Sequence, residues 1–320
     1  MTYFKVFIML AILGMASAYN NPYQYSCPDV EKISKAITGY FVAKNPTFAP
    51  GLLRMVFHDC AVRGCDASVL LDPTPSNNAT EKTAVPNLTL NGYEVVNAVK
   101  AELEMRCPGV VSCADVLALT SRDAIVAING PWWYVPLGRK DGRISLASEA
   151  VKFLPSPRAN ISTLKKNFAD IGLSSKDLVV LSGGHTIGIG HCNIIQNRLY
   201  NFTGKGDTDP KIEASYAKIL KYKCPQRVGD LTTVAGMDSI SPKVFDKEYF
   251  TTVSQRKGFF ESDAALLDDY YTKSYLQSQA NSNGATFAND FAASMTKLIQ
   301  LGFGSQGEVR KTCGAVKSYY

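Results

Sequence analysis

Long apolar runs are missing from this 320-residue chain after its first 18 residues. No later stretch approaches the about 20 apolar residues that a membrane-spanning helix needs, so we expect no membrane segment once those residues are removed. Long blocks of consecutive basic residues are also missing, which argues against nucleic acid as a partner. The chain has no C-x-x-C or H-x-x-x-H pair, and this excludes the common zinc motifs.

The composition is that of a globular protein. Hydrophobic residues make up 46% and charged residues 19% of the chain, with no internal repeat or low-complexity tract. These values exclude a disordered, collagenous or coiled-coil protein. A typical domain length of about 150 residues suggests two units, but single domains of this size also exist. Covalent ties between distant segments must therefore decide the number of domains.

The first 18 residues have the pattern of a secretory signal. Lys5 precedes an apolar run over residues 6–16, and the small residues Ala16-Ser17-Ala18 predict a cut after Ala18. We therefore expect a mature chain of residues 19–320 that is extracellular or vacuolar. Removal of the signal takes away one lysine and no acid, so the net charge falls from +6 to +5. This positive charge suits adhesion to an acidic matrix. Four sequons fit a secreted glycoprotein: Asn78, Asn87, Asn160 and Asn201.

Eight cysteines follow the signal, an even number that predicts disulfides in an oxidising compartment. Spacing singles out one pair, Cys60 with Cys65, which would close a small loop. The sequence arithmetic leaves the other pairings open.

Apolar residues recur mostly with the helical period, and two-residue alternation is scarce, so we expect a mainly α fold with very few short strands. Residues 130–160 are rich in Gly and Pro and contain both tryptophans, and they are predicted to be an irregular connection between two halves. Helical patterns cover residues 28–45, 52–60, 95–103, 114–128, 164–171, 178–181, 211–222, 246–256 and 286–300.

Histidine is scarce, with only His58, His185 and His191 in the chain. Arg54 and His58 stand four residues apart in a helical pattern, so both side chains leave one face. The arginine charge would lower the His58 pKa below its usual value of about 6.5 and keep a neutral base available at neutral pH. The alternative is a partly exposed helix whose polar edge carries both residues.

The loop after His58 is rich in oxygen ligands. It would be closed by Cys60 and Cys65, and its carboxylates, hydroxyl and backbone carbonyls form a hard-oxygen cage that suits Ca²⁺. The alternative is an ordinary polar turn with acidic caps. The candidate ligands are Asp59, Val62, Gly64, Asp66 and Ser68.

The second histidine lies among glycines, in Ser182-Gly183-Gly184-His185-Thr186-Ile187-Gly188. Glycines let a flat group approach closely, so His185 is a candidate axial ligand of a haem. The alternative is a structural histidine near a helix end.

Two motifs and the cysteine ladder make the chain similar to the secretory plant haem peroxidases, the class III family. The similarity extends from about Tyr23 to Val316, nearly all of the mature chain. It rests on the glycine-flanked His185 segment and on Leu53-Arg54-x-x-Phe57-His58-Asp59-Cys60-x-Val62-x-Gly64-Cys65-Asp66-Ala67-Ser68.

On the distal side of a haem, the resemblance implies that His58 is the acid/base, with Arg54 beside it, Phe57 against the haem and Asn87 orienting His58. The imidazole would take a proton from the iron-bound peroxide oxygen and return it to the departing oxygen. Arg54 would stabilise the charge that develops on the leaving oxygen.

On the proximal side, His185 resembles the axial iron ligand, Asp263 its carboxylate support and Pro155 the proline that lines the donor site. A carboxylate on the second ring nitrogen gives the ligand imidazolate character and supplies the electron density that O–O cleavage needs.

The resemblance also implies the metal sites, the disulfides and a two-lobed helical fold with one haem b between the lobes. The implied Cys113–Cys313 disulfide would tie the middle of the chain to its end, which favours one domain over residues 19–320. The first of two Ca²⁺ sites is the loop described above, and the second comprises Thr186, Asp238, Ser241, Val244 and Asp246. The disulfides would be Cys27–Cys107, Cys60–Cys65, Cys113–Cys313 and Cys192–Cys224.

The implied function is a secreted, monomeric peroxidase. It would reduce hydrogen peroxide to water and oxidise small phenolic or other aromatic donors in one-electron steps through an oxoferryl intermediate. The implied setting is the cell wall, with acidic polysaccharide as a further partner and with roles in phenolic cross-linking, lignification, defence or oxidative stress. Arg158 and Ile194 stand where the best-known member has phenylalanines at its donor site, which leaves the choice of donor open.

Two other functions are consistent with parts of the sequence. One is a Ca²⁺-stabilised, matrix-adhering glycoprotein without turnover, but such a scaffold has no need of a distal base. The other is a haem carrier or gas sensor, which a charged Arg/His pocket disfavours because it promotes O–O cleavage over reversible O₂ binding.

Overall fold

The computed structural model describes residues 21–317. The predicted signal peptide, residues 1–18, and its cut lie outside the described residues. Within the described range, no helix has both the length and the apolar character needed to cross a lipid bilayer.

The described chain is mainly helical, as the periodicity predicts. Its only strands, β1 (Ile189–His191) and β2 (Val234–Gly236), form one antiparallel pair within the described residues. Short 3₁₀ helices are η1 (Ser68–Leu70), η2 (Glu81–Thr83), η3 (Val85–Asn87) and η4 (Gly183–Thr186). The α-helices are α1 (Val30–Lys44), α2 (Phe48–Cys60), α3 (Tyr93–Arg106), α4 (Cys113–Ala127), α5 (Ala147–Phe153), α6 (Ile161–Asp170), α7 (Ser175–Ser182), α8 (Cys192–Tyr200), α9 (Ala214–Lys223), α10 (Glu248–Ser254), α11 (Glu261–Ala265), α12 (Tyr270–Ala280) and α13 (Ala285–Leu298).

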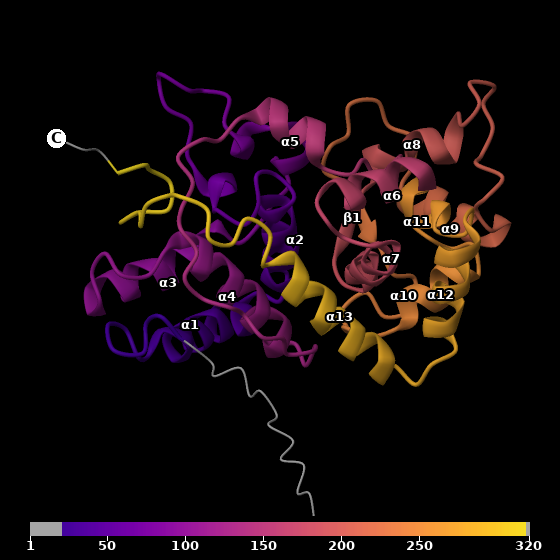
Figure 1. Cartoon of the computed structure of the whole chain (residues 1–320). Helices are drawn as coiled ribbons and strands as arrows, with labels where there is room; N and C mark the ends of the chain where they lie inside the picture. The colour runs from indigo at the N-terminus through magenta and orange to yellow at the C-terminus, as the bar shows by residue number, and fades with distance from the viewer. Residues whose placement is uncertain (1–20, 318–320) are drawn as a thin grey trace, which may run out of the picture.

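The helices gather in two groups, with α1 to α4 in one, α6 to α12 in the other and α13 running diagonally between them (Figure 1). In the first group, α4 packs against α1, α2 and α3, and all of its residues except Val126 and Ala127 are buried. One cluster of buried apolar side chains includes members of both groups, such as Leu52 on α2, Phe250 on α10 and Phe287 on α13. A shared core therefore holds the two groups together.

Residues 130–160 are not wholly irregular, contrary to the prediction, because α5 lies within them. This helix buries only Ala150, while Val151 is 62% exposed. A helix with so small a buried face has no apolar stripe for the helical period to show.

The start of α7 has a capping box. The Ser174 hydroxyl accepts the N–H of Asp177 at 3.2 Å, and the Asp177 carboxylate accepts the N–H of Ser174 at 2.9 Å. Capping satisfies amides that the first turn leaves free. The helix then leads directly into η4, which carries His185.

Four disulfides join the described cysteines, in the pairs that the family resemblance predicts: Cys27–Cys107, Cys60–Cys65, Cys113–Cys313 and Cys192–Cys224.

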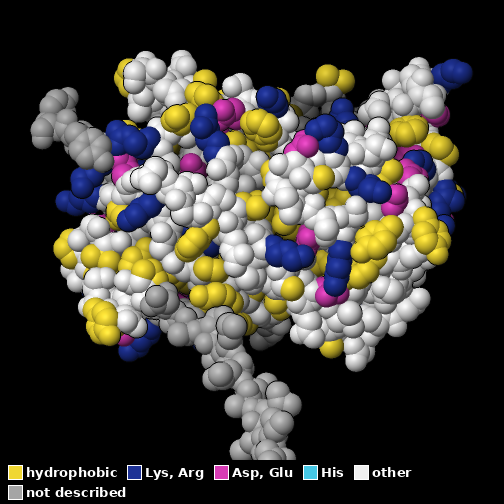
Figure 2. Space-filling view, in the orientation of Figure 1, with side chains coloured by type: hydrophobic (Ala, Val, Ile, Leu, Met, Phe, Trp, Pro, Cys, Tyr) yellow, Lys and Arg dark blue, Asp and Glu magenta, His cyan; other side chains and the backbone are white. Residues whose placement is uncertain are grey.

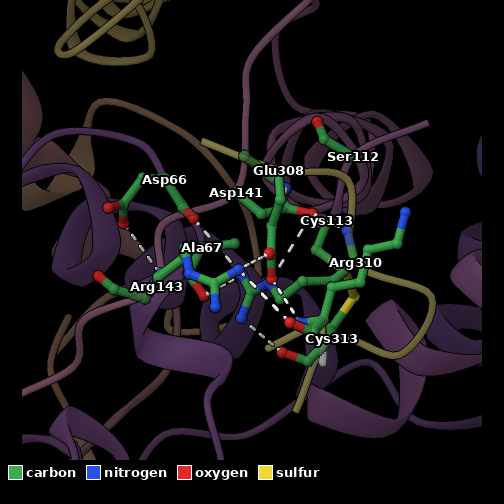
Figure 3. A network of polar contacts seen from close by, with 12 residues as sticks. Asp66, Ala67, Ser112, Cys113, Asp141, Arg143, Glu308, Arg310 and Cys313 are labelled. Atoms are coloured by element: carbon green, nitrogen blue, oxygen red, sulfur yellow. Dashed lines mark hydrogen bonds and ion pairs between the residues drawn. A yellow bond between two sulfur atoms is a disulfide. The ribbon is translucent and has the colours of Figure 1, made fainter. Parts of the chain in front are cut away.

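Buried Arg310 fastens the C-terminal segment to the loop after α2 (Figure 3). Its guanidinium donates to the carbonyls of Ala67 and Cys313, both at 2.7 Å. Its backbone N–H donates to Asp141 at 2.8 Å, and Asp141 also accepts the N–H of Ala114 in α4 at 2.9 Å. The loop that carries the predicted calcium ligands is thereby tied to both α4 and the C-terminal segment.

The outer surface carries charges of both signs. Figure 2 shows Lys and Arg interspersed with Asp and Glu over one face, with no histidine visible there. A mixed surface of this kind fits the modest net charge of +6.

Candidate active site

Helix α2 presents Arg54 and His58 together. Leu52 and Met55 on this helix are fully buried, which fixes the orientation of the helix and leaves Arg54 on its exposed side. The Nε–H of Arg54 donates to Nε2 of His58 at 3.2 Å. The structure therefore pairs a fixed cation with an imidazole on one helical turn.

The other ring nitrogen of His58 is held by Asn87. The two atoms, Nδ1 of His58 and Oδ1 of Asn87, lie 2.6 Å apart. The Asn87 amide nitrogen donates to the carbonyl of Glu81 at 2.8 Å, so its oxygen must face the histidine and accept the proton on Nδ1. This arrangement leaves Nε2 of His58 as the unprotonated, basic nitrogen.

Arg54 also reaches the segment that carries Asn87. Its terminal nitrogens donate to the carbonyl of Pro86 at 2.6 Å and to the hydroxyl of Thr89 at 2.8 Å. Hydrogen bonds thus connect helix α2 to the η3 segment at two side chains, Arg54 and His58.

Low pH should protonate His58 and so remove the base. Burial, and then the charge of Arg54, lower the pKa of His58 to about 3, so the imidazole is neutral above this value and protonated below it. We expect the rate of reaction with peroxide to stay constant across neutral pH and to fall only as the pH approaches 3. Rapid-mixing kinetics against pH measure this. A half-maximal rate near pH 6.5, the value of an unperturbed imidazole, would contradict it.

Asn87 should carry no glycan although it begins a sequon. Its side chain is buried, and the nitrogen to which a glycan would be attached already donates to Glu81. Asn78, Asn160 and Asn201 are exposed, so we expect glycans only on these three. Glycopeptide mass spectrometry of the native protein decides the matter, and substantial occupancy of Asn87 in active enzyme would remove it from the network around His58.

The second predicted histidine has a buried carboxylate behind it. The Nδ1–H of His185 donates to Asp263 at 2.9 Å, and the same carboxylate accepts the Tyr249 hydroxyl at 2.9 Å and the Phe260 amide at 2.8 Å. Burial alone would raise the pKa of Asp263, but His185 and these hydrogen bonds lower it. Asp263 is therefore a carboxylate that orients the imidazole.

The backbone of η4 needs glycine because aromatic rings press against it. A Cβ on Gly183 would stand 2.7 Å from Phe287 and 2.8 Å from Phe250. A Cβ on Gly184 would touch Leu53, the residue before Arg54, at 3.4 Å. The His185 segment and the Arg54 helix therefore lie against each other.

The donor set fits a haem. His58 and His185 each have one ring nitrogen fixed by a protein oxygen, and an imidazole supported by a buried carboxylate, as in His185, is a usual iron ligand. Phe57 lies between the groups, its ring centroid 6.2 Å from that of His58 and 5.9 Å from that of Phe168 on α6. The apolar ring is suited to contact a flat macrocycle.

The loop after His58 buries acids together. Asp59 is buried and accepts the N–H groups of Ala67 and Val69 at 2.9 and 3.3 Å. Burial raises its pKa well above the usual range, and the charges of Asp66 and Glu81 raise it further. Clustered buried carboxyls are costly unless a cation neutralises them.

Unpartnered oxygens lie in this loop and in the nearby η2. Among the described residues, the Ser68 hydroxyl and both carboxylate oxygens of Glu81 are buried without a hydrogen-bond partner. In the described range no three His, Cys, Asp or Glu side chains form a metal cluster, so a cation here would also need hydroxyl and carbonyl oxygens, which Ca²⁺ accepts. These donors fit the predicted site at Asp59, Val62, Gly64, Asp66 and Ser68.

The second predicted set of calcium ligands gathers around the hydroxyl of Thr186. The Thr186 oxygen lies 3.4 Å from the Asp238 carboxylate, 3.4 Å from the Val244 carbonyl and 3.2 Å from the Asp246 carboxylate. The Ser241 hydroxyl is buried without a partner in the described chain. Hydroxyl, carbonyl and carboxylate oxygens from two distant segments thus gather beside His185.

The predicted donor-site residues lie near the support of His185. Pro155 belongs to the segment after α5, where the Pro157 carbonyl accepts the N–H of Ser262 in α11 at 3.0 Å. Arg158 donates twice to the carbonyl of Ile194, at 3.2 and 3.1 Å. The remaining histidine, His191, pairs its Nδ1 with the Leu231 carbonyl at 3.0 Å and belongs to the small sheet instead.

Two supporting residues were missed by the sequence analysis. Glu81 connects the first set of oxygens with Asn87, and Tyr249 shares Asp263 with His185. Neither has a local motif, since each acts through residues distant in the sequence, although Glu81 stands six residues before Asn87 in the same short segment.

Comparison with known proteins identifies the family. The family model described as "Peroxidase" matches residues 31–282. The chain is 52% identical to "Peroxidase 1" of Arabidopsis thaliana over 96% of both chains. It is 54% identical to "Peroxidase 56" of the same plant over 92% of this chain and 89% of that protein. Against "Peroxidase 1" of Oryza sativa subsp. japonica the identity is 49%, over 92% and 91%. This chain is therefore an enzyme that belongs to the peroxidase family.

Proposed function

We propose that the enzyme is a secreted, monomeric haem b peroxidase with two Ca²⁺ ions and a single domain over residues 19–320. It reduces hydrogen peroxide and oxidises small phenolic donors by one electron at a time. The observation that carries the proposal is the pair of imidazoles, each held in one tautomer by a buried oxygen, Asn87 for His58 and Asp263 for His185. The shared core and the Cys113–Cys313 disulfide support the single domain.

Haem would supply the iron at which the O–O bond is reduced and would store the two oxidising equivalents. His58 accepts the proton of the bound peroxide on Nε2 and returns it to the oxygen that leaves as water. Arg54, 3.2 Å from that nitrogen, stabilises the negative charge on the leaving oxygen. His185 would hold the iron, and Asp263, 2.9 Å from Nδ1 of His185, would accept its proton in a hydrogen bond and orient the ring.

The proposed setting is the cell wall. The exposed sequons and the predicted signal support secretion, and the net positive charge supports contact with acidic polysaccharide. Phenolic cross-linking, lignification, defence and the response to oxidative stress are the proposed roles, since phenoxyl radicals couple in such a matrix.

A visible spectrum tests the proposal. The purified holoenzyme is recorded before and after one equivalent of hydrogen peroxide and again after a phenol is added. The Soret band should shift with peroxide and recover with the phenol. A band that does not respond to peroxide would leave a haem-binding scaffold. A panel of neutral, anionic and polymer-linked phenols under steady-state kinetics then identifies the preferred donor.

A further inference from the structure

One oxygen of Asp263 is shared by two side-chain donors. Oδ1 accepts the Nδ1–H of His185 and the hydroxyl of Tyr249, both at 2.9 Å. Oδ2 accepts the backbone N–H of Phe260 at 2.8 Å. A carboxylate has no proton to give, so both side chains must donate to it. His185 and Tyr249 therefore compete for the electron density of a single oxygen.

Burial keeps water out of this competition. Tyr249 is 1% exposed and Asp263 is 2% exposed. Burial, and then the charge of Asp263, raise the pKa of the Tyr249 hydroxyl well above its usual range, so the hydroxyl stays protonated and remains a donor at neutral pH. Hydrogen bonds to an ionised group are about twice as strong as those between neutral groups, and a low local dielectric strengthens them further. The Tyr249 hydroxyl is therefore a strong influence on this carboxylate.

The surrounding backbone fixes the position of Asp263. A Cβ on Gly258 would stand 2.7 Å from the Cβ of Asp263, so the chain at this glycine packs tightly against the side chain. The buried guanidinium of Arg198 donates to the carbonyls of Phe259 and Phe260 at 2.9 and 3.1 Å. These contacts hold the start of α11, and with it the carboxylate, in place beside its two donors.

Sharing the oxygen changes how strongly Asp263 acts on His185. A hydrogen bond to a carboxylate stabilises its charged form and makes it a weaker base. The Tyr249 hydroxyl thus weakens the pull of Oδ1 on the Nδ1 proton of His185. An imidazole with less imidazolate character gives less electron density to an iron, which raises the reduction potential of the iron and slows O–O cleavage. Tyr249 therefore opposes the electron supply that Asp263 provides.

We propose that Tyr249 is a positioning residue that sets the oxidising strength of the enzyme, because it withholds part of Asp263 from His185. This inference rests on the proposed role of His185 as the iron ligand. It also concerns the class of donor. With Tyr249 in place, the enzyme takes electrons from phenols that hold them tightly, such as those with an electron-withdrawing ring substituent. Without this hydroxyl, the enzyme is restricted to electron-rich phenols.

The test is Tyr249→Phe, which removes the hydroxyl and keeps the ring. Spectroelectrochemistry of the holoenzyme gives the midpoint potential of the iron, and resonance Raman spectra of the reduced enzyme give the stretching frequency of the iron–imidazole bond. The potential should become more negative and the frequency should rise. The rate at which peroxide-treated enzyme oxidises 4-cyanophenol should fall about tenfold, the effect of losing part of one charged hydrogen bond. The rate with 4-methoxyphenol should change much less.

Tyr216→Phe is the matched control. Tyr216 is also buried, and its hydroxyl has no hydrogen-bond partner among the described residues, although the charge of Asp263 acts on it. Its removal should leave the potential and the stretching frequency unchanged. Tyr249→3-fluorotyrosine gives the opposite sign, because the more acidic phenol donates more strongly. The potential should then rise and the frequency should fall, and this variant keeps the buried hydroxyl that the fold uses.

Three outcomes would overturn the proposal. Tyr249→Phe leaves both the potential and the stretching frequency at their wild-type values, or Tyr216→Phe shifts them equally, or the fluorinated variant shifts them in the same direction as Tyr249→Phe. Failure of the proposed function looks different. If His185 does not hold the iron, Asp263→Asn will leave the iron–imidazole frequency unchanged, or that band will be missing from the wild-type enzyme.

Discussion

Replacing His58 with alanine should slow the reaction with peroxide about 10²- to 10⁴-fold, the usual contribution of a positioned acid/base. The variant loses the only imidazole that Arg54 and Asn87 hold in place. It keeps His185 and Asp263, so the Soret band of the resting enzyme should be retained. The measurement is the second-order rate constant for the spectral change on mixing with peroxide.

His191→Ala is the matched control. This histidine bonds to Leu231 in the small sheet and touches none of the residues around His58, so its removal should leave the rate unchanged. The contrast between the two variants separates a loss of the base from a general effect of removing an imidazole. Near-wild-type reaction of the His58→Ala enzyme would show that the proton moves by another route.

The sequence predicts this site well where a motif is local. Arg54 and His58 lie one helical turn apart, so a helix necessarily brings them to one face. Asn87 and Asp263 follow from no spacing, because their positions depend on how separate helices pack, and only the family resemblance pointed to them. Neither spacing nor the family resemblance pointed to Glu81, since its significance comes from burial beside Asp59.

The helices also divide into those that a local sequence pattern predicts and those that it does not. Helices with a broad buried face, such as α1, α2 and α13, are predicted within a few residues, because burial imposes the helical period on their apolar residues. Helices α5, α8, α11 and α12 were not predicted. In α12 only Thr272, Leu276 and Gln279 are buried, so two of the three inward positions are polar. The Thr272 hydroxyl instead donates to the Leu266 carbonyl at 2.7 Å, and the Gln279 amide nitrogen donates to Tyr275 at 2.8 Å. No apolar pattern records such bonds.

Removal of Ca²⁺ should lower the melting temperature and the activity together. Asp59 is joined to His58, and Thr186 to His185, by a single peptide bond, so each ion would anchor one histidine of the proposed haem site. A ligand that binds only the folded state adds about 2.7 kcal/mol to the free energy of unfolding when its free concentration is about 100 times its Kd. Two such sites would contribute about twice that. The measurements are thermal unfolding, the Soret band and peroxide turnover before and after exhaustive chelation and after Ca²⁺ is returned.

Single substitutions separate the two proposed ions. Asp66→Asn should weaken binding at the loop after α2 and chiefly disturb His58, which slows the reaction with peroxide. Asp246→Asn should disturb the His185 side and shift the Soret band of the resting enzyme. Asp170→Asn, at an exposed acid paired only with Lys166, removes the same charge without touching either loop and should change neither property. If chelation leaves both the melting temperature and the Soret band unchanged, the acids around Asp59 must be neutralised by protons instead, which the pKa of Glu81, raised to about 8 chiefly by burial, already favours.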